Sequence, residues 1–355
     1  MKILDPENAS PPPKLSICIA TLNRGDVIAS TLDSILAQLH PAIEIVIVDG
    51  ASTDSTPEIL ANYCHKCPSL RYYREDKNSG VDADFDRSVH YAKGVYCWLM
   101  TDDDLLLPGA IHRILVALNS APDLVIVDAE VKTEDFGATL QKSRMDLTAD
   151  MHFNTADDLF LETAGDALSF IASVIIRRDL WLRRNRNRYY GSLFIHVGVI
   201  LQTPCLENIM VLSTPAISIR YGVAMWTPRT FEIWMFKWPE LIWSFPAFSD
   251  HAKRSVCAER PWRNPLQLLK HRARGSYSIA EYREYVMHRS SFLQRTIALG
   301  IARLPGKLVN FYAVLYVVFL NRNARLGLSD LLNSPDSSKA AKFLAKLFPL
   351  GSPHS

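Results

Sequence analysis

The sequence predicts an α/β fold with a mainly parallel sheet, followed by a mostly helical C-terminal region. Patterns typical of strands and helices alternate over the first hundred residues, as they do in proteins with such a sheet. The predicted strands are almost entirely apolar, as expected for a sheet that is covered on both faces. Beyond about residue 225 the composition shifts toward tryptophan and basic residues, which separates the C-terminal region from the sheet.

Length and composition limit the class of protein. The chain has 355 residues, 48% hydrophobic and 21% charged, so it can bury the core of one large or two moderate domains. A net charge of +2 argues against a nucleic-acid-binding protein. The cysteines are scattered, and Cys18 and Cys97 fall in predicted core strands, which indicates reduced thiols. Cys64 and Cys67 have the spacing of a redox or zinc pair, but no second pair follows, so a metal is not expected there.

We expect three segments along the chain. Residues 1–13 end in a serine and three prolines and are expected to form a disordered tail. Residues 14–225 form the predicted α/β domain, and residues 226–355 form the helical C-terminal region. No charged and then apolar leader precedes residue 14, so secretion is not expected.

The elements of the α/β domain follow from apolar periodicity and from turn residues. Predicted strands cover residues 15–20, 43–48, 70–73, 95–100, 173–177 and 217–221. A helix is expected after each of the first four strands, and the third of these helices covers residues 82–93. Asp26 can cap the first helix, and Ser55 with Glu58 has the spacing of a capping box at the start of the second.

Polar segments follow the first four strands, at residues 21–24, 49–54, 74–82 and 102–104. Ligands of parallel sheets bind beyond the carboxyl ends of the strands, so these segments are expected to meet at one site. Their acids, arginines and lysine fit a nucleotide with a metal-bound diphosphate. Neither G-x-G-x-x-G after the first strand nor G-x-x-x-x-G-K-[ST] is present, which argues against dinucleotide oxidoreductases and P-loop NTPases.

The strand at residues 95–100 runs into three adjacent aspartates, Asp102, Asp103 and Asp104. Burying three like charges without a counter-charge is unfavourable by several kcal/mol. Mg²⁺ or Mn²⁺ would remove this penalty, because such ions take one or two carboxylates and complete their shell with water and substrate phosphates. The alternative is a solvated acidic turn that caps the helix after Pro108 and Gly109.

Three motifs occur in a recognisable order and spacing: Leu15-Ser-Ile-Cys-Ile-Ala-Thr-Leu-Asn-Arg24, Ile47-Val-Asp-Gly-Ala-Ser-Thr-Asp-Ser-Thr56 and Asp102-Asp-Asp-Leu-Leu-Leu-Pro108. Together they resemble the family 2 glycosyltransferases of GT-A fold. The resemblance covers roughly residues 14–125 and implies that residues 14–225 form a GT-A nucleotide-binding domain. The stretch from Asn78 to the three aspartates resembles more narrowly the bacterial abequosyltransferase-like enzymes of O-antigen assembly.

The resemblance implies roles for residues that would bind the nucleotide. Thr21, Asn23 and Arg24 match the first nucleotide-binding turn of the family, and Asp49 matches the acid that contacts the base. Further nucleotide-binding residues expected at the same edge are Asp54, Gly80 and Asp82.

The resemblance also implies a metal. Asp102, Asp103 and Asp104 match the DXD region, in which one acid contacts the ribose and another holds the metal on the diphosphate. Thr101 stands where many relatives carry a further aspartate. We expect Asp104, together with Asp102, to hold Mg²⁺ or Mn²⁺, and Asp102 or Asp103 to lie nearer the ribose.

The catalytic base has two candidates. In inverting members of the family a carboxylate takes the proton of the acceptor hydroxyl, commonly from a Glu-Asp pair, and this chain has no obvious pair in the matching region. His196 is a candidate because imidazole titrates near neutral pH, and the alternative is a core histidine on an apolar helix. Asp166 is the other candidate, and it could equally be a turn or cap residue. Arg220 could reach the diphosphate or be an ordinary surface arginine.

Aromatic and basic residues are interleaved between residues 225 and 274. This mixture suits a membrane interface, where aromatic rings lie at headgroup depth and cations meet anionic lipid, and it also suits a second hydrophobic core. The most apolar stretch, residues 308–320, has 13 residues. A spanning helix needs roughly 20 apolar residues, so a buried or in-plane helix is expected.

We therefore expect a hexosyl- or deoxyhexosyltransferase that moves a sugar from a nucleotide-sugar donor to a glycan acceptor, lipid-linked if the C-terminal region lies at a membrane, in surface-polysaccharide assembly. The expected location is cytoplasmic, peripheral at the inner face of the plasma membrane. Inversion at the anomeric carbon is implied by the resemblance alone. Two alternatives stay open. A nucleotidyl- or phosphosugar-transferase would carry an Arg/Gly-rich N-terminal signature that is absent here, and a non-catalytic sugar-nucleotide-binding scaffold would fit the missing Glu-Asp pair.

Overall fold

The computed structural model describes residues 12–222, 229–321 and 324–348, so the tail predicted at residues 1–13 lies almost wholly outside the described residues. The chain divides into two compact units. The first consists of residues 1–128, 147–156 and 167–218. The second consists of residues 129–146, 157–166 and 219–355. Two short segments from the first half of the chain therefore belong to the unit that holds the C-terminal helices.

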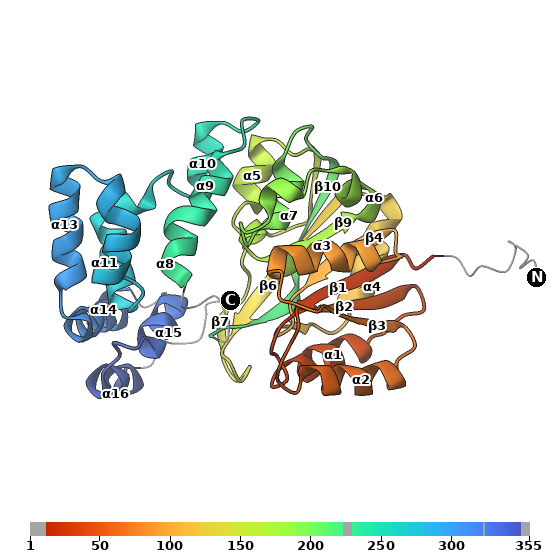
Figure 1. Ribbon diagram of the computed structural model, residues 1–355, viewed down its shortest axis with the longest axis horizontal. Coiled ribbons are helices and arrows are strands. Elements are labelled where there is room, and N and C mark those ends of the chain that lie inside the picture. Colours follow the sequence, from red (N-terminus) through yellow and green to blue (C-terminus); the bar gives the residue numbers. More distant parts are fainter. Residues whose placement is uncertain (1–11, 223–228, 322–323, 349–355) are drawn as a thin grey trace, which may run out of the picture. The chain divides into compact units, whose positions relative to one another are not determined.

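The first unit is built on a mixed sheet with the strand order β3-β2-β1-β4-β9-β6-β10-β5, and β8 pairs with β10 (Figure 1). The first four strands run parallel to one another, and β9 joins β4 in the opposite direction. The strands are β1 Leu15–Thr21, β2 Ile43–Asp49, β3 Leu70–Arg74, β4 Tyr96–Met100, β5 Leu105–Leu106, β6 Leu124–Lys132, β8 Met151–Thr155, β9 Val174–Arg177 and β10 Glu207–Arg220. The last residues of β6 and β10 are counted with the second unit. The helices of this unit are α1 Ile28–Leu36, α2 Thr56–Lys66, α3 Val81–Tyr91, α4 Ala110–Ala117, α6 Arg178–Arg183 and α7 Ile195–Leu201.

The structure confirms the predicted strands and helices of the first hundred residues. Every residue of β1, β2 and β4 is buried, which explains why these strands lack a polar alternation. The strand predicted at residues 217–221 is the end of the longer β10. Both predicted caps are wrong, because α1 begins after Val27 without a side-chain cap and Ser55 makes no cap hydrogen bond. Asp54 instead accepts a hydrogen bond from the backbone N–H of Thr56 at 3.0 Å.

The register of the parallel strands brings the predicted polar segments to one edge of the sheet. Thr21 at the end of β1 lies beside Asp49 of β2, which lies beside Arg74 of β3. On the other side, Ile19 of β1 lies beside Met100 of β4, so the acids that follow Met100 come level with Thr21. The convergence expected from the sequence is therefore present in the first unit.

The second unit is mainly helical. It contains the short strand β7 Thr139–Gln141 and the helices α5 Asp158–Ala164, α8 Thr230–Glu232, α9 Trp238–Trp243, α10 Asp250–Val256, α11 Pro265–Ala273, α12 Ile279–Glu281, α13 Phe292–Arg303, α14 Gly306–Leu320, α15 Arg325–Asn333 and α16 Lys339–Leu347. Single π-helical turns join α8 to α9, at Ile233–Lys237, and follow α12, at Tyr282–Val286.

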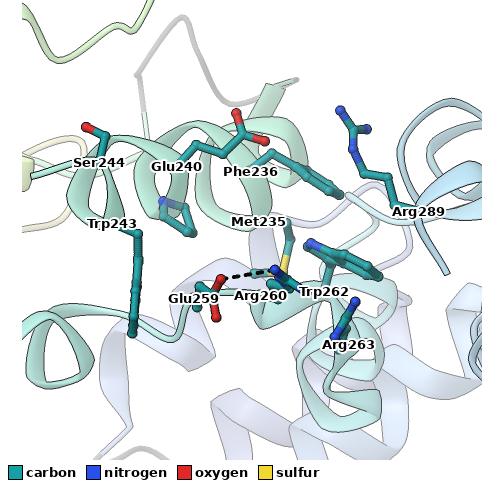
Figure 2. Close-up of a pocket in the computed structure, with 11 residues that line it drawn as sticks. Met235, Phe236, Glu240, Trp243, Ser244, Glu259, Arg260, Trp262, Arg263 and Arg289 are labelled. Atoms are coloured by element: carbon teal, nitrogen blue, oxygen red, sulfur yellow. Dashed lines mark ion pairs between the residues drawn. The ribbon is translucent and has the colours of Figure 1, made fainter. Parts of the chain in front are cut away.

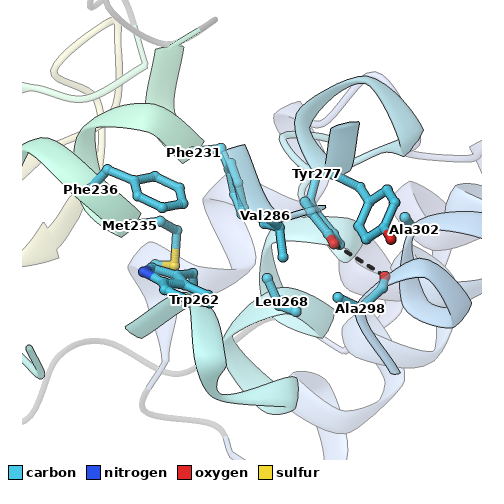
Figure 3. Packing of buried hydrophobic residues seen from close by; sticks show 10 residues of the cluster. Phe231, Met235, Phe236, Trp262, Leu268, Tyr277, Val286, Ala298 and Ala302 are labelled. Carbon is cyan, nitrogen blue, oxygen red and sulfur yellow. Dashed lines mark hydrogen bonds between the residues drawn. The ribbon is translucent and has the colours of Figure 1, made fainter. Parts of the chain in front are cut away.

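Most of the aromatic residues between residues 229 and 286 form a hydrophobic core of this unit (Figure 3). The ring of Phe231 stacks on Tyr277 with 4.8 Å between centroids, and Phe236 stacks on Trp262 at 6.0 Å. The hydroxyl of the fully buried Tyr277 donates to the carbonyl of Ala298 at 3.1 Å. Of the two interpretations of this segment, the second hydrophobic core accounts for these buried aromatics.

Helix α14 covers the stretch expected to be a buried or in-plane helix. Gly306, Val314, Val317 and Val318 on one side of it are buried, whereas its other side is exposed. Within the described residues no single helix is long and apolar enough to cross a membrane, although α13 and α14, bent by 89° at their junction, reach that length and composition as a pair.

Candidate functional site

Three buried carboxylates follow β4. Asp102, Asp103 and Asp104 are only 9%, 8% and 2% exposed. Arg24, from the turn after β1, places its Nε 3.3 Å from Asp102 Oδ1 and its Nη2 2.9 Å from Asp103 Oδ2. Asp104 accepts a hydrogen bond from the hydroxyl of Thr101. The buried, ion-paired arrangement excludes the alternative of a solvated acidic turn.

The charge of this cluster is only partly compensated. Burial, and then repulsion by Asp103, raise the pKa of Asp102 to about 7, although Arg24 and the Thr21 hydroxyl act in the opposite direction. A second cation beside these carboxylates would therefore be favourable. Within the described residues no group of three or more His, Cys, Asp or Glu side chains is arranged to hold a metal ion alone. Mg²⁺ or Mn²⁺ needs only one or two protein carboxylates when substrate phosphates and water supply its other ligands, and Asp102 and Asp104 fit this requirement.

Asp49, the residue expected to contact the base, is fully buried at the end of β2. Its Oδ2 accepts a hydrogen bond from the Tyr72 hydroxyl at 2.7 Å, and its Oδ1 accepts one from the backbone N–H of Ser52 at 2.8 Å. The Nε atom of Arg74 lies 4.0 Å from the same carboxylate. The aspartate is thus held rigidly, and its predicted contact with a base would need a ligand to approach the Tyr72 and Arg74 side.

The turns after β1 and β2 are joined by hydrogen bonds. Asn23, which has a φ of 52°, receives the backbone N–H of Thr53 on its Oδ1 at 2.8 Å. The carboxylate of Asp54 accepts from the backbone N–H groups of Gly25 and Thr56, both at 3.0 Å. These hydrogen bonds outweigh the effect of burial and lower the pKa of Asp54. Asp54 therefore has a structural contact in addition to its predicted nucleotide contact, which stays a prediction.

The start of α3 contributes Gly80 and Asp82. Gly80 has a φ of 89°, which favours glycine, and the space where a side chain would begin is open. Asp82 is 4% exposed, and its carboxylate accepts from the backbone N–H groups of Leu193 at 2.9 Å and Ile195 at 3.1 Å. Asp82 thereby fixes the beginning of α7. Its predicted contact with the nucleotide remains a prediction.

Asp84 is an acid of this edge that sequence reasoning missed. It is buried, its Oδ1 lies 3.0 Å from Nη1 of Arg87, and its Oδ2 lies so near Gly50 that a β-carbon there would come within 2.6 Å. Burial raises the pKa of Asp84 to about 6, against the opposing effect of Arg87. The sequence feature that could have indicated Asp84 is its position in the first turn of α3, directly after the polar segment at residues 74–82.

His196 lies in α7 and is 1% exposed. Its Nε2 is 2.7 Å from the carbonyl oxygen of Leu168, so Nε2 carries the proton in the neutral ring. Its buried Nδ1 has no hydrogen-bond partner within the described residues. Burial lowers the pKa of His196 to about 4, although the bond to Leu168 acts in the other direction. The ring thus has an unprotonated nitrogen at neutral pH, which both a base and a core histidine could have.

The remaining two candidates belong to the second unit. Asp166 has a side chain that is 77% exposed, and it pairs with Arg144 at 3.2 Å. Arg220 donates to the carbonyl of Glu134 at 3.3 Å, and its guanidinium lies 4.5 Å from the ring centre of Phe136. The roles of Asp166 as base and of Arg220 toward a diphosphate remain predictions.

The second unit has a cavity of its own, with a volume of about 510 Å³ (Figure 2). Its lining includes Trp243, Trp262 and the arginines Arg260, Arg263 and Arg289. Arg263 lies over the ring of Trp262 at 5.1 Å, and Arg260 forms an ion pair with Glu259 at 3.2 Å. None of the residues expected to bind donor or metal lines this cavity.

Comparison with known proteins shows which family the N-terminal half of the chain resembles. Residues 16–182 match the family described as glycosyl transferase family 2. This segment, just under half of the chain, is similar to the glycosyltransferase domains of that family, as the three sequence motifs predict.

Individual relatives narrow the comparison. Abequosyltransferase RfbV of Salmonella typhimurium is 27% identical over 219 residues, which cover 58% of this chain and 63% of RfbV. The GalNAc(5)-diNAcBac-PP-undecaprenol beta-1,3-glucosyltransferase of Campylobacter jejuni is 23% identical over 181 residues, which cover 51% of this chain and 57% of that protein. The chain thus spans less than two thirds of the length of either relative.

A solved structure supports the fold assignment. The crystal structure of S. aureus TarS 1-349 in complex with UDP-GlcNAc matches 90% of this chain and 91% of that chain, with a TM-score of 0.51 and 17% identity. At this identity the likeness concerns the fold alone, and it supports the expected GT-A architecture.

Proposed function

We propose that the protein transfers a sugar from a nucleotide-sugar donor to a hydroxyl of a glycan acceptor during the assembly of a bacterial surface polysaccharide such as an O-antigen. The observation that carries this proposal is the buried cluster of Asp102, Asp103 and Asp104 with Arg24 at the carboxyl edge of the parallel strands. The names of the Salmonella and Campylobacter relatives and the UDP-GlcNAc bound to the TarS fragment support this class of reaction.

The residues of the first unit divide the work of donor binding. Asp49, held by Tyr72 and Ser52, is proposed to face the base, while Asp102 or Asp103 faces the ribose. Asp104 and Asp102 would hold Mg²⁺ or Mn²⁺, which when bound would neutralise negative charge on the leaving diphosphate. Arg24, within ion-pair distance of Asp102 and Asp103, is proposed to hold both carboxylates in place before the donor arrives.

The transfer forms a bond between the acceptor oxygen and the anomeric carbon, and it breaks the bond from that carbon to the nucleoside diphosphate. The proton of the acceptor hydroxyl must go to a base, for which His196 Nδ1 and the carboxylate of Asp166 are the proposed candidates. His196 presents a lone pair but is buried, so an acceptor would need α7 or its neighbours to open. We propose inversion at the anomeric carbon, as the family resemblance implies.

The proposed acceptor is a lipid-linked glycan, and the proposed location is the cytoplasmic face of the plasma membrane. The name of the Campylobacter relative contains a PP-undecaprenol carrier, which supports an acceptor of this kind. A protein that modifies such an acceptor must work at a membrane surface.

The test is nucleotide release from a panel of UDP-, GDP-, CDP- and dTDP-sugars in Mn²⁺, Mg²⁺ or EDTA. The panel is repeated with Asp104→Asn and with the matched control Asp250→Asn, an exposed acid of α10 in the second unit. Slow release of a nucleoside diphosphate from one donor, dependent on the metal and lost only in Asp104→Asn, is the expected result. Release of pyrophosphate would instead indicate a nucleotidyltransferase, and the absence of both release and donor binding would refute the proposal.

A further inference from the structure

We propose that the second unit binds the surface of an anionic lipid bilayer through one face of α14 and α16, with both helices lying in the plane of the membrane. We call this surface the lipid face. It consists of Leu308, Tyr312, Tyr316, Phe319 and Leu320 of α14 with Phe343, Leu347 and Phe348 at α16. The biological purpose of this binding rests on the proposed function, because an enzyme with a membrane-bound acceptor must reach the membrane surface. The binding itself is argued from the surface of the second unit alone.

Helix α14 is anchored to protein along one side only. Asn310, fully buried, donates to the carbonyl oxygens of Ala273 at 3.0 Å and Leu331 at 2.8 Å. Val314 and Val318 continue this buried side. The opposite side repeats every four residues at Leu308, Tyr312, Tyr316 and Leu320, and these side chains are between 55% and 76% exposed.

Helix α16 has three faces of different character. Ala341 and Ala345 are buried against the unit. Phe343 and Leu347, four residues apart, are 62% and 55% exposed. Lys339, Lys342 and Lys346 are also exposed and form a basic stripe on the same helix. A helix with this division is typical of the membrane interface.

The exposed apolar stripes of the two helices form one surface. The rings of Phe319 and Phe348 are in contact, with centroids 5.1 Å apart, so the end of the α14 stripe meets the end of α16. Exposed apolar groups in such number mark an interaction surface. Tyr312 and Tyr316 add hydroxyls to apolar rings, which suits the headgroup region.

The charges around the lipid face favour anionic lipid over a second copy of the chain. The sequence has no aspartate or glutamate between Glu284 and Asp330, and none after Asp336. Lysines therefore border the face without acids of the same helices to neutralise them. In a symmetric dimer through this face the same lysine stripes would approach each other, whereas an anionic bilayer attracts them.

An in-plane arrangement follows from the dimensions of α14. Its 15 residues span about 22 Å, less than the roughly 30 Å of a hydrocarbon core. Its buried side carries Asn310, which is bound to two carbonyls of the unit, so that side stays with the protein.

The experiment is flotation of the full chain with vesicles of pure phosphatidylcholine and of phosphatidylcholine with phosphatidylglycerol, at low and high salt. The first variant carries Lys339→Gln, Lys342→Gln and Lys346→Gln. Its matched control carries the same changes at Lys66, Lys93 and Lys142, which are exposed lysines elsewhere. A second variant carries Phe343→Ser and Leu347→Ser, and its control carries Val116→Ser and Leu266→Ser at other exposed positions.

We expect the parent to bind anionic vesicles and to release them at high salt. The lysine variant should bind about a hundredfold more weakly, since each lysine near the surface contributes about fivefold. The serine variant should also lose binding to the anionic vesicles, and both controls should bind like the parent. Equal binding of the lysine variant and its control would overturn the proposal. A parent protein that binds neither kind of vesicle would also overturn the proposal. If light scattering showed that the parent is a dimer and that the serine variant is not, the lipid face would instead be assigned to contact with a second copy of the chain.

Nucleotide release is measured for the same variants without vesicles. It is expected to be unchanged, because no residue of the lipid face belongs to the donor site. If the parent released no nucleotide from any donor, the proposed function would be refuted and the vesicle result would still stand. If the parent bound no vesicle, the lipid face would be refuted and the proposed function would still stand.

Discussion

Replacing Asp84 by asparagine should make the protein more stable at neutral pH and leave its stability unchanged in acid. In the folded chain burial raises the pKa of Asp84 from the ordinary 3.8 to about 6. A carboxyl with a raised folded pKa stabilises the protein fully below pH 3.8, and this contribution is lost as the pH rises through about 6.

The size of the effect follows from the two pKa values. The difference between 3.8 and about 6 corresponds to about 3 kcal/mol, and the side chain of Asp84 is only 5% exposed, so little of it is screened by solvent. The opposing attraction of Arg87 is already contained in the raised value. Asparagine resembles the protonated acid in shape and charge, so the variant should gain about 2 to 3 kcal/mol at pH 7.5.

Urea unfolding of parent and variant at pH 7.5 and pH 4 measures this gain. The control is Asp76→Asn, which removes an exposed acid from a nearby loop and should change the free energy of unfolding by less than about 0.5 kcal/mol at either pH. A gain of the same size at both pH values, or a less stable variant at pH 7.5, would show that burial does not raise the pKa of Asp84.

Three further predictions concern His196 and Gly198 of α7 and the second candidate base, Asp166. If His196 is the base, His196→Ala should lower kcat about a hundredfold or more and leave donor affinity unchanged. Because burial lowers the pKa of His196 to about 4, kcat of the parent should show no inflection near pH 6.5. An unchanged kcat in the variant would exclude His196 as the base. Gly198→Ala should destabilise the protein by about 1 to 3 kcal/mol in urea unfolding, since its β-carbon would lie 2.2 Å from the Tyr189 ring, whereas the control Gly300→Ala meets nothing within 4 Å and should be neutral or stabilising. Asp166→Asn should change the free energy of unfolding by less than about 0.5 kcal/mol because its pair with Arg144 is exposed, so any large loss of turnover would identify it as the base.

The sequence predicted the parts of the site that depend on local pattern and strand direction. Parallel strands must place their carboxyl ends on one edge, so Thr21, Asp49 and the acids after β4 could be brought together without coordinates. The place of Asp84 in the site could not be predicted from the sequence, because its burial depends on how α3 packs against Gly50 and on the position of the Arg87 side chain. The caps failed because Asp54, and not Ser55, accepts the backbone N–H of Thr56 at the start of α2, and because α1 begins after Val27 without a side-chain cap.

The C-terminal region shows a different limit. Composition reports how many aromatic residues a segment holds, but not which side of a helix they occupy. Phe236 and Trp262 pack into a core, whereas Tyr312 and Phe343, which lie farther along the chain, are exposed. The exposed apolar residues of α14 and α16 therefore lie outside the tryptophan-rich segment, for which a membrane interface and a hydrophobic core were the two interpretations.

The hydrogen bonds from the backbone N–H groups of Leu193 and Ile195 to Asp82 limit how far the first unit can be truncated. The stretch that matches the glycosyltransferase family ends at residue 182, before either of these partners. A fragment that ended there would leave a buried carboxylate without its two donors, and it would also remove β10, which pairs with β5 directly after the acidic turn. We therefore expect that a fragment able to keep this edge of the sheet in shape must extend to the end of β10, beyond the stretch that matches the family.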